Sequence, residues 1–219
     1  MLRITVLSLS LALLAGCTTD GQKSVPRAAA DAMTGSPWTL TAVSSLTIEG
    51  AGKGTDQSGL PFAITSFQRV MNFKKGAWQQ QESRDGGPLR SKSLAGAERL
   101  HHPFGFVMAA FAPGAKLSNT RREGNAEAVD LAADGAIHTL FIDAATKLPI
   151  KIVSRSGNET VETSFDKYVA VHGYHLPSHI TRKLGDSVAW ELNITRQIAS
   201  ADAVPLVASA PGDQSAEIR

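Results

Sequence analysis

Cysteine, aromatic residues and blocks of like charge are all scarce in this chain of 219 residues. Cys17 is the single cysteine, so neither an intramolecular disulfide nor a cysteine-based metal site is expected. Aromatic residues make up 6% of the sequence, Lys and Arg form no block longer than two residues, and the formal net charge is +2. Binding along a phosphate backbone needs clustered Lys and Arg, and stacking on bases needs aromatic side chains. Because both are scarce here, nucleic acid is not an expected partner.

The sequence also has few long hydrophobic runs, and the longest of them lies at its start. Arg3 is followed by an apolar stretch from Ile4 to Leu14 and then by the small residues Ala15 and Gly16. These are the three parts of a secretory signal. The stretch is shorter than the roughly 20 apolar residues that span a bilayer. We therefore interpret residues 1–16 as a signal peptide that is removed.

The residues up to Cys17 form a more specific motif. LAGC, from Leu14 to Cys17, resembles the lipobox of bacterial lipoproteins, which implies acyl chains such as palmitate on Cys17, and several chains anchor a protein firmly to a membrane. In that family an Asp after the cysteine tends to signal inner-membrane retention. Thr18 therefore favours the outer membrane, facing the periplasm. The alternative is an ordinary signal peptide cut nearby, with a free thiol.

Low-complexity stretches flank one domain. Residues 17–37 are rich in Thr, Ser, Ala, Gly and Pro, which predicts a flexible tether with a helical turn at RAAADAM. Residues 199–219 have a similar composition and are predicted to form a flexible tail. The folded domain is expected to occupy residues 38–198, a length that suits one hydrophobic core.

Alternation of apolar and polar residues dominates the predicted domain. The clearest case is SVAWELNITRQI, in which every second residue from Val188 to Ile194 is apolar, as in a half-buried strand. Turns are expected near Gly135, Gly157, Gly173 and Gly185. One stretch differs: LAGAERLHHPFGFVMAAFAPG is predicted to form one or two helices broken near Pro103 and Gly105. The fold class is therefore α+β, mostly β, with helices covering the apolar face of an antiparallel sheet.

Residues suited to catalysis are few. His172, His175 and His179 in HGYHLPSH could bind zinc or copper, but strand alternation lets at most His175 and His179 share a face. His101 and His102 end a predicted helix, where a structural role is expected. The sequence contains no nucleophile elbow, phosphate-binding loop or zinc helix motif. We expect no enzyme activity, no cofactor and no metal, with the three-histidine site as an alternative.

Apolar side chains of the helical insert are expected to face those of the sheet. A hydrophobic core is one interpretation of this set, and a ligand cavity between the sheet and a helical lid is the other. The candidate ligand-binding residues are Phe67, Phe104, Phe106, Met108, Phe111, Phe141 and Trp190.

Five phrases, in order along residues 38–198, carry a family resemblance: VSSLTIEGAGKG, FQRVMNFKKGAWQQQESR, HPFGFVMAAFAPGAKLSN, IDAATKLPIKI and YVAVHGYHLPSHITR. They resemble the β-rich domain found ahead of the catalytic domain in some metallo-β-lactamase-fold hydrolases, itself similar to the LolA/LolB-type lipoprotein carriers. The His-x-His-x-Asp-His motif of the hydrolases is absent, so hydrolase activity is not implied.

The LolA/LolB-type resemblance implies an antiparallel half-barrel with a helical insert over its concave face, a shape that shelters acyl chains in that family. We therefore expect a non-enzymatic binding module for a hydrophobic or amphipathic ligand, such as a lipid or a lipoprotein acyl group. The alternative is a structural or interaction subunit of an envelope complex, with a fully packed core and an envelope protein as its partner.

Overall fold

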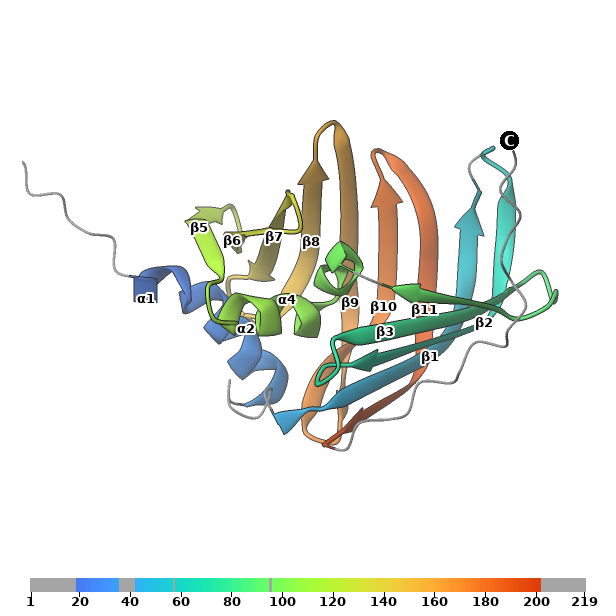
Figure 1. Ribbon diagram of the computed structural model, residues 1–219, viewed down its shortest axis with the longest axis horizontal. Helices are drawn as coiled ribbons and strands as arrows, with labels where there is room; N and C mark the ends of the chain where they lie inside the picture. Colours follow the sequence, from blue (N-terminus) through green and yellow to red (C-terminus); the bar gives the residue numbers. More distant parts are fainter. Residues whose placement is uncertain (1–18, 36–41, 57, 95, 202–219) are drawn as a thin grey trace, which may run out of the picture.

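One open sheet of eleven antiparallel strands forms most of the protein (Figure 1). The computed structural model describes residues 19–35, 42–56, 58–94 and 96–201. The strands lie in the order β4-β3-β2-β1-β11-β10-β9-β8-β7-β6-β5, which confirms the predicted antiparallel meander. Their bounds are β1 Ser45–Thr55, β2 Pro61–Asn72, β3 Ala77–Arg84, β4 Arg90–Leu94, β5 Lys116–Glu123, β6 Ala126–Ala133, β7 Ala136–Asp143, β8 Pro149–Ser156, β9 Glu159–Val171, β10 Tyr174–Leu184 and β11 Ser187–Ser200.

The helical insert connects the two edges of this sheet. The helices of the described ranges are α1 Thr19–Gln22, α2 Ser24–Thr34, the 3-10 helix η1 Gly96–His101 and α4 Pro103–Phe111. Because β4 and β5 are opposite edges and η1 and α4 join them, the chain has to cross the sheet there. It crosses on the concave side (Figure 1), so the predicted half-barrel with a helical insert is confirmed.

Two residues explain where the insert breaks. Pro103 occupies the first turn of α4, the helix position that tolerates proline best, so it begins this helix instead of interrupting it. Gly105 lies inside α4, where a Cβ atom would fall on the carbonyl oxygen of Arg99. The glycine is required by the close approach of η1 and α4, and between Gly96 and Phe111 the helical insert breaks only before Pro103, not at Gly105.

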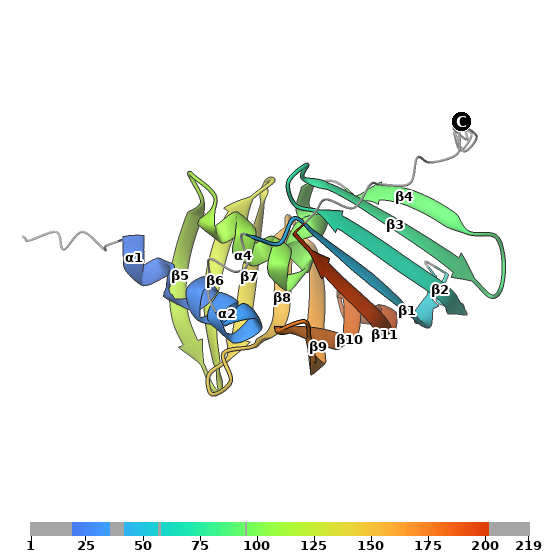
Figure 2. The ribbon, with the colours of Figure 1, turned by 90° about the horizontal axis from the view of Figure 1, so that it is seen from below.

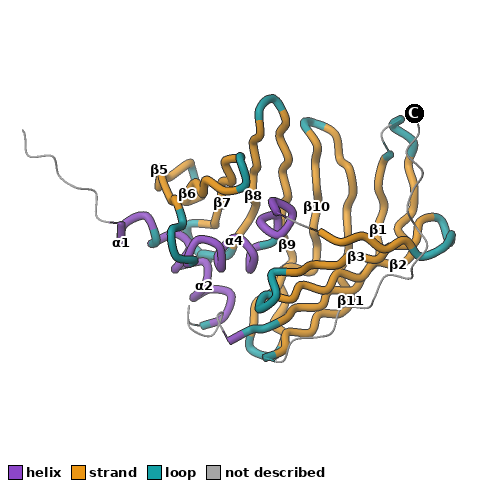
Figure 3. Tube along the Cα trace, in the orientation of Figure 1, coloured by secondary structure: helices purple, strands orange, loops and turns teal. Residues whose placement is uncertain are grey.

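The helices cover one half of the concave face. In Figures 1, 2 and 3, α2 and α4 lie over the half that runs from β5 toward β9. On the other half, near the turns β1–β2 and β3–β4, none of the described helices lies over the sheet. One half of the concave face is therefore covered by helices, and the other half is not covered by any of the described helices.

The helical turn expected at RAAADAM lies within α2, but the interpretation of residues 17–37 as a flexible tether is wrong for this helix. Val25, Ala29, Ala30 and Met33 are each at most 3% exposed and belong to the main hydrophobic core. Val25 and Met33 lie three to five residues from the adjacent pair Ala29 and Ala30, so the four form one apolar stripe of the helix. Met33 alone contributes about 1.5–3 kcal/mol by its burial. Cys17, the signal peptide and residues 202–219 lie outside the described residues, while β11 extends the folded part to Ser200.

Glycines on β1 let the sheet bend tightly. Gly50 and Gly52 follow a register shift between β1 and β11, and a second shift toward β2 lies between them. A Cβ atom at Gly52 would fall on the carbonyl oxygen of Glu191, and one at Gly50 on that of Asn193. Bulges and glycines are the usual means of bending a sheet. These positions therefore set the curvature of the half-barrel.

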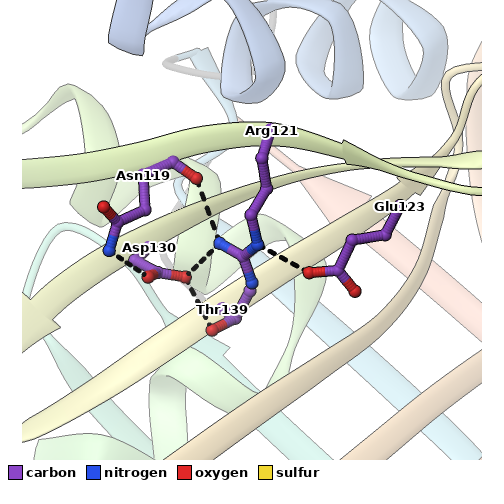
Figure 4. A network of polar contacts seen from close by, with 5 residues as sticks. All are labelled: Asn119, Arg121, Glu123, Asp130 and Thr139. Carbon is purple, nitrogen blue, oxygen red and sulfur yellow. Dashed lines mark hydrogen bonds and ion pairs between the residues drawn. The ribbon is translucent and has the colours of Figure 1, made fainter.

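A polar network fixes the edge strand β5 to β6 and β7 (Figure 4). Asp130 accepts hydrogen bonds from Asn119 Nδ2 at 2.9 Å, Arg121 Nη1 at 3.0 Å and Thr139 Oγ1 at 2.8 Å. Arg121 Nε donates to Glu123 at 2.6 Å. The pairing of β5 with β6 shifts between Ser118 and Arg121, and a bulged edge strand is protected against pairing with another chain.

We expect Gly52→Ala to destabilise the fold by about 3 kcal/mol or more, because the new methyl group has to displace the backbone of β11. Denaturant unfolding of both proteins measures this change. Gly21→Ala is the control, since nothing lies within 4 Å of a Cβ atom built there. A Gly52→Ala protein as stable as wild type would show that the bend at β1 is not imposed by this glycine.

Candidate functional site

Strand pairing identifies the side chains of the concave face. Directly paired residues of antiparallel strands point to the same side of the sheet. Phe67 pairs with Glu82 and Glu82 with Arg90, while Arg69 pairs with Gln80 and Gln80 with Lys92. Trp78 is part of the main core and contacts His102 of the insert, so the face that holds Trp78, Gln80 and Glu82 is the concave one.

A cavity of about 540 Å³ opens on the half of this face without helices. We call it the mouth cavity, and its lining residues are Thr55, Asp56, Ser58, Phe62, Arg84, Ala189 and Trp190. Gly54 pairs with Phe62 on one side and with Trp190 on the other. Because Gly54 has no side chain, the Phe62 ring occupies the space above it. The volume lies in the range of small-molecule sites, roughly 300–1,000 Å³.

The polar atoms at the mouth cavity are mostly engaged. Arg84 lies with its guanidinium carbon 4.1 Å from the centre of the Phe62 ring and its Nε donates to Glu82 at 2.8 Å. Hydrogen bonds from the Ser58 hydroxyl and the Leu60 backbone N–H lower the pKa of Asp56. Asp56 therefore holds the β1–β2 turn, while Arg84 presents a positive charge beside two aromatic rings.

A row of polar side chains continues from Arg84 into the interior. Gln80 Nε2 donates to Glu82 at 2.7 Å, and Arg69 Nη2 donates to Gln80 at 2.5 Å. Arg69 is 4% exposed, and its buried Nε has no hydrogen-bond partner. Burial lowers the pKa of Arg69 to about 10. An unsatisfied buried donor costs about 1–3 kcal/mol, so this row is not explained by stability alone.

An ion pair holds the insert against the sheet. Arg182 of β10 donates from Nη1 and Nη2 to the two carboxylate oxygens of Glu98 in η1, at 2.7 and 2.6 Å. Burial raises the pKa of Glu98, but the hydrogen bonds and charge of Arg182 outweigh it and hold that pKa at about 2. The two-pronged geometry is the strongest that Arg and carboxylate form. Arg182 is thus a structural clamp on the concave face.

Buried histidines lie under the insert. His102 is 1% exposed and caps α4, with Nδ1 accepting from the Phe104 backbone N–H at 3.3 Å. Burial, and then the charge of Arg69, lower the pKa of His102 to about 3. Burial, and then the charge of Arg182, lower the pKa of His101 to about 4. Both rings are therefore neutral at physiological pH, and the predicted structural role agrees with their position.

The structure separates the seven predicted ligand-binding residues into five groups, of which Phe141 alone forms the last. Phe67, Phe104 and Phe106 are at most 3% exposed and form the core beneath the insert. Trp190 lines the mouth cavity. Met108 lines a second cavity of about 290 Å³ between α4 and the β2–β3 turn, and Phe111 lines a third of about 300 Å³ beside the start of α2. Phe106 is therefore unsuited to a test of binding, because its removal would disturb the fold.

Phe141 was wrongly assigned to the concave face. Its ring belongs to a separate cluster with Ala126, Ala128 and Val153 on the convex side of the sheet. Lys151 Nζ lies 4.8 Å from the ring centre and the Arg121 guanidinium carbon 5.8 Å from it. Two cationic side chains thus cover an outward ring. Alternation gave two sets of residues on β7 but did not identify which one points inward.

The three histidines of HGYHLPSH have separate surroundings. His172 lies at the β9–β10 turn with φ +49°, and His175 donates from Nδ1 to the Ala32 carbonyl at 3.0 Å. Burial lowers the pKa of His179, but hydrogen bonds with Glu191 and Asp166 outweigh it and raise that pKa. In the described ranges no group of three His, Cys, Asp or Glu is arranged to hold a metal ion.

Sequence reasoning missed Phe62, Arg69 and Arg84. Phe62 stands next to the proline that begins β2, and both arginines lie in strands whose inward face could not be known. The only available signal was the strand pattern itself, in which Arg69 lies two residues from Phe67 and so shares its face.

Comparison with known proteins places the fold but gives no close relative. No family model and no curated protein matches this chain. It is similar to a LolA superfamily protein from Nitrosomonas europaea, with 10% identity, a TM-score of 0.46 and coverage of 80% of this chain and 92% of the other. It is also similar to a DUF1329 family protein from Desulfovibrio piger, with 6% identity, a TM-score of 0.50 and coverage of 83% and 92%.

At a TM-score of 0.50, the likeness to the DUF1329 family protein shows that this chain shares its overall fold. At these identities the likeness extends to the open half-barrel and no further. Within the described part of the chain, none of the helices has the length and apolar character to cross a bilayer.

We expect acid to destabilise the protein through His101 and His102. The unfolded chain binds protons near the ordinary pKa of 6.5, whereas the folded chain does not until about 4 and 3. Stability is therefore lost as the pH falls below about 6.5, by about 2 kcal/mol for each ring between about pH 7 and pH 5.

Denaturant unfolding across this pH range tests the sign and size of the effect. His102→Asn keeps a side chain that caps helices well but removes the titrating ring, so we expect it to halve the loss. Unfolding free energies with the same pH dependence in both proteins would contradict the role assigned to His102.

Proposed function

We propose that this protein is a non-enzymatic binding module for a hydrophobic or amphipathic ligand, held at the mouth cavity of the half-barrel. We further propose that Cys17 is acylated and anchors the module to the outer membrane, where it faces the periplasm. The first part is supported by the geometry of the concave face. The second part is supported by the LAGC motif and by Thr18.

The observation that carries the binding proposal is the position of the mouth cavity. It lies between Phe62 and Trp190 on the half of the concave face that the described helices leave open. Apolar rings with a few placed polar groups are typical of a small-molecule site. The half under the insert is filled at its centre, where Phe104 and Phe106 are fully buried.

A structural or interaction subunit is the second candidate. It is favoured by the continuous core between α2, α4 and the sheet, in which Met33, Phe104 and Phe106 are 0% exposed. A core packed in this way resembles an organic crystal in density and takes up no guest. The two candidates differ at the mouth cavity, which a purely structural subunit would not use.

We expect Trp190→Ala to weaken uptake of the neutral fluorescent probe N-phenylnaphthylamine about tenfold, because a large aromatic contact is lost. Fluorescence titration of the purified protein measures the affinity. Val169→Ala is the control, because Val169 is an exposed side chain near the β9–β10 turn, at the other end of the strands.

The variant Met108→Ala, titrated in the same way, distinguishes the second cavity from the mouth cavity. If the probe binds at the mouth cavity, its affinity for Met108→Ala should equal that for the wild type. Equal probe affinity for the wild type and Trp190→Ala would reject the mouth cavity as the site. No uptake by the wild type would favour the structural subunit.

We expect Cys17→Ser to move the protein from the membrane fraction to the soluble periplasmic fraction and to abolish labelling with palmitate, because the acyl chains supply the anchor. Thr18→Asp keeps the cysteine and should instead shift the protein to the inner membrane on a density gradient. Membrane association that survives Cys17→Ser would refute the proposed anchor.

A further inference from the structure

Charged side chains on β2, β3 and β4 all point inward. The concave face of these strands carries four cationic residues and one carboxylate: Arg69, Arg84, Arg90, Lys92 and Glu82. The convex face of the same strands carries uncharged residues, among them Gln68, Gln79, Gln81, Ser83, Ser91 and Ser93. A one-sided sheet normally directs its charges to the solvent side, so the usual pattern is reversed here.

The carboxylates on this face do not balance the cations. Glu82 is bound by Arg84 and Glu98 by Arg182, so each carboxylate is matched by one arginine. Arg90 and Lys92 are exposed, and neither has an ion-pair partner within the described ranges of the chain. Together with Arg69 they leave three uncompensated positive charges on the concave side of β2–β4.

The position of these charges suits a ligand of opposite sign. Arg84 lines the mouth cavity. Arg90, on the edge strand β4, pairs with Glu82 of β3, which in turn pairs with Phe67 of β2. Arg69 lies deeper, with an unpartnered Nε, and a charge in a low-dielectric interior acts over a longer distance than one in water. The face therefore presents positive potential directly beside the aromatic rings of Phe62 and Trp190.

We propose that the ligand of the half-barrel is an amphipath with an anionic head group. Its apolar chain lies against Phe62 and Trp190, and Arg84, Arg90 and Lys92 bind a phosphate or carboxylate head. This inference rests on the proposed binding function and names the chemical class of its ligand.

Two probes with the same apolar chain test the inference. The binding of dodecyl phosphate and of dodecanol to the purified protein is measured by calorimetry and native mass spectrometry, below micellar concentrations. We expect dodecyl phosphate to bind about tenfold more tightly, with an advantage that shrinks as salt is added. Arg90→Gln combined with Lys92→Gln should reduce this advantage about threefold to tenfold and leave dodecanol binding unchanged.

The matched control removes the same charge elsewhere on the same strands. Lys74 and Lys75 are exposed in the β2–β3 turn, at the other end of β2 and β3. The double variant Lys74→Gln, Lys75→Gln should keep the full preference for the phosphate. A loss of equal size in both double variants would show a general effect of net charge and overturn the inference.

Three further outcomes separate the inference from the function on which it rests. Equal affinities for dodecyl phosphate and dodecanol would overturn the anionic head group but leave the binding module intact. Inorganic phosphate binding as tightly as dodecyl phosphate would indicate a simple anion site and overturn the amphipath. Failure of both dodecyl probes to bind would overturn the binding function and the inference together.

Discussion

Strand order imposes the constraint on which the rest of this structure depends. The meander begins with β1 beside β11 and reaches the two edges of the sheet at β4 and β5, which are consecutive in the chain. The segment between them has to cross one face of the sheet, and here it crosses the concave face, so a covering insert follows from the topology. Curvature from Gly50 and Gly52 shortens that crossing, and the hydrophobic effect closes the covered half around Phe104 and Phe106.

The same crossing divides the concave face into regions with different chemistry. Under α2 and α4 the face is apolar and closely packed, and its buried histidines are kept neutral by desolvation. Beyond η1 the face turns polar, and the Arg182–Glu98 pair stands at the boundary. A buried ion pair adds little net stability, whereas its fixed geometry positions the insert. Stability is concentrated on one side of this boundary and the open cavity lies on the other.

Much of the fold could be predicted from local pattern. Period-two alternation, as from Val188 to Ile194, defined strands, and glycine-containing turns ordered them into a meander. The apolar stretch around Phe106 defined the insert. A helical turn was expected at RAAADAM, which lies within α2. The burial of this helix was missed, because small residues such as Ala29 and Ala30 give a weak apolar signal and their burial depends on a surface elsewhere in the chain.

The candidate site was harder to predict, for a reason of symmetry. Alternation tells which residues share a face but not which face is inside, so Phe141 was assigned to the wrong side and Arg69 and Arg84 were not considered. The sequence by itself determined the mostly-β class, the antiparallel order and the helical insert, because these follow from backbone geometry and local periodicity. Only the tertiary structure decided that the charges of β2–β4 point inward, because that depends on which side the insert crosses and which way the sheet curls.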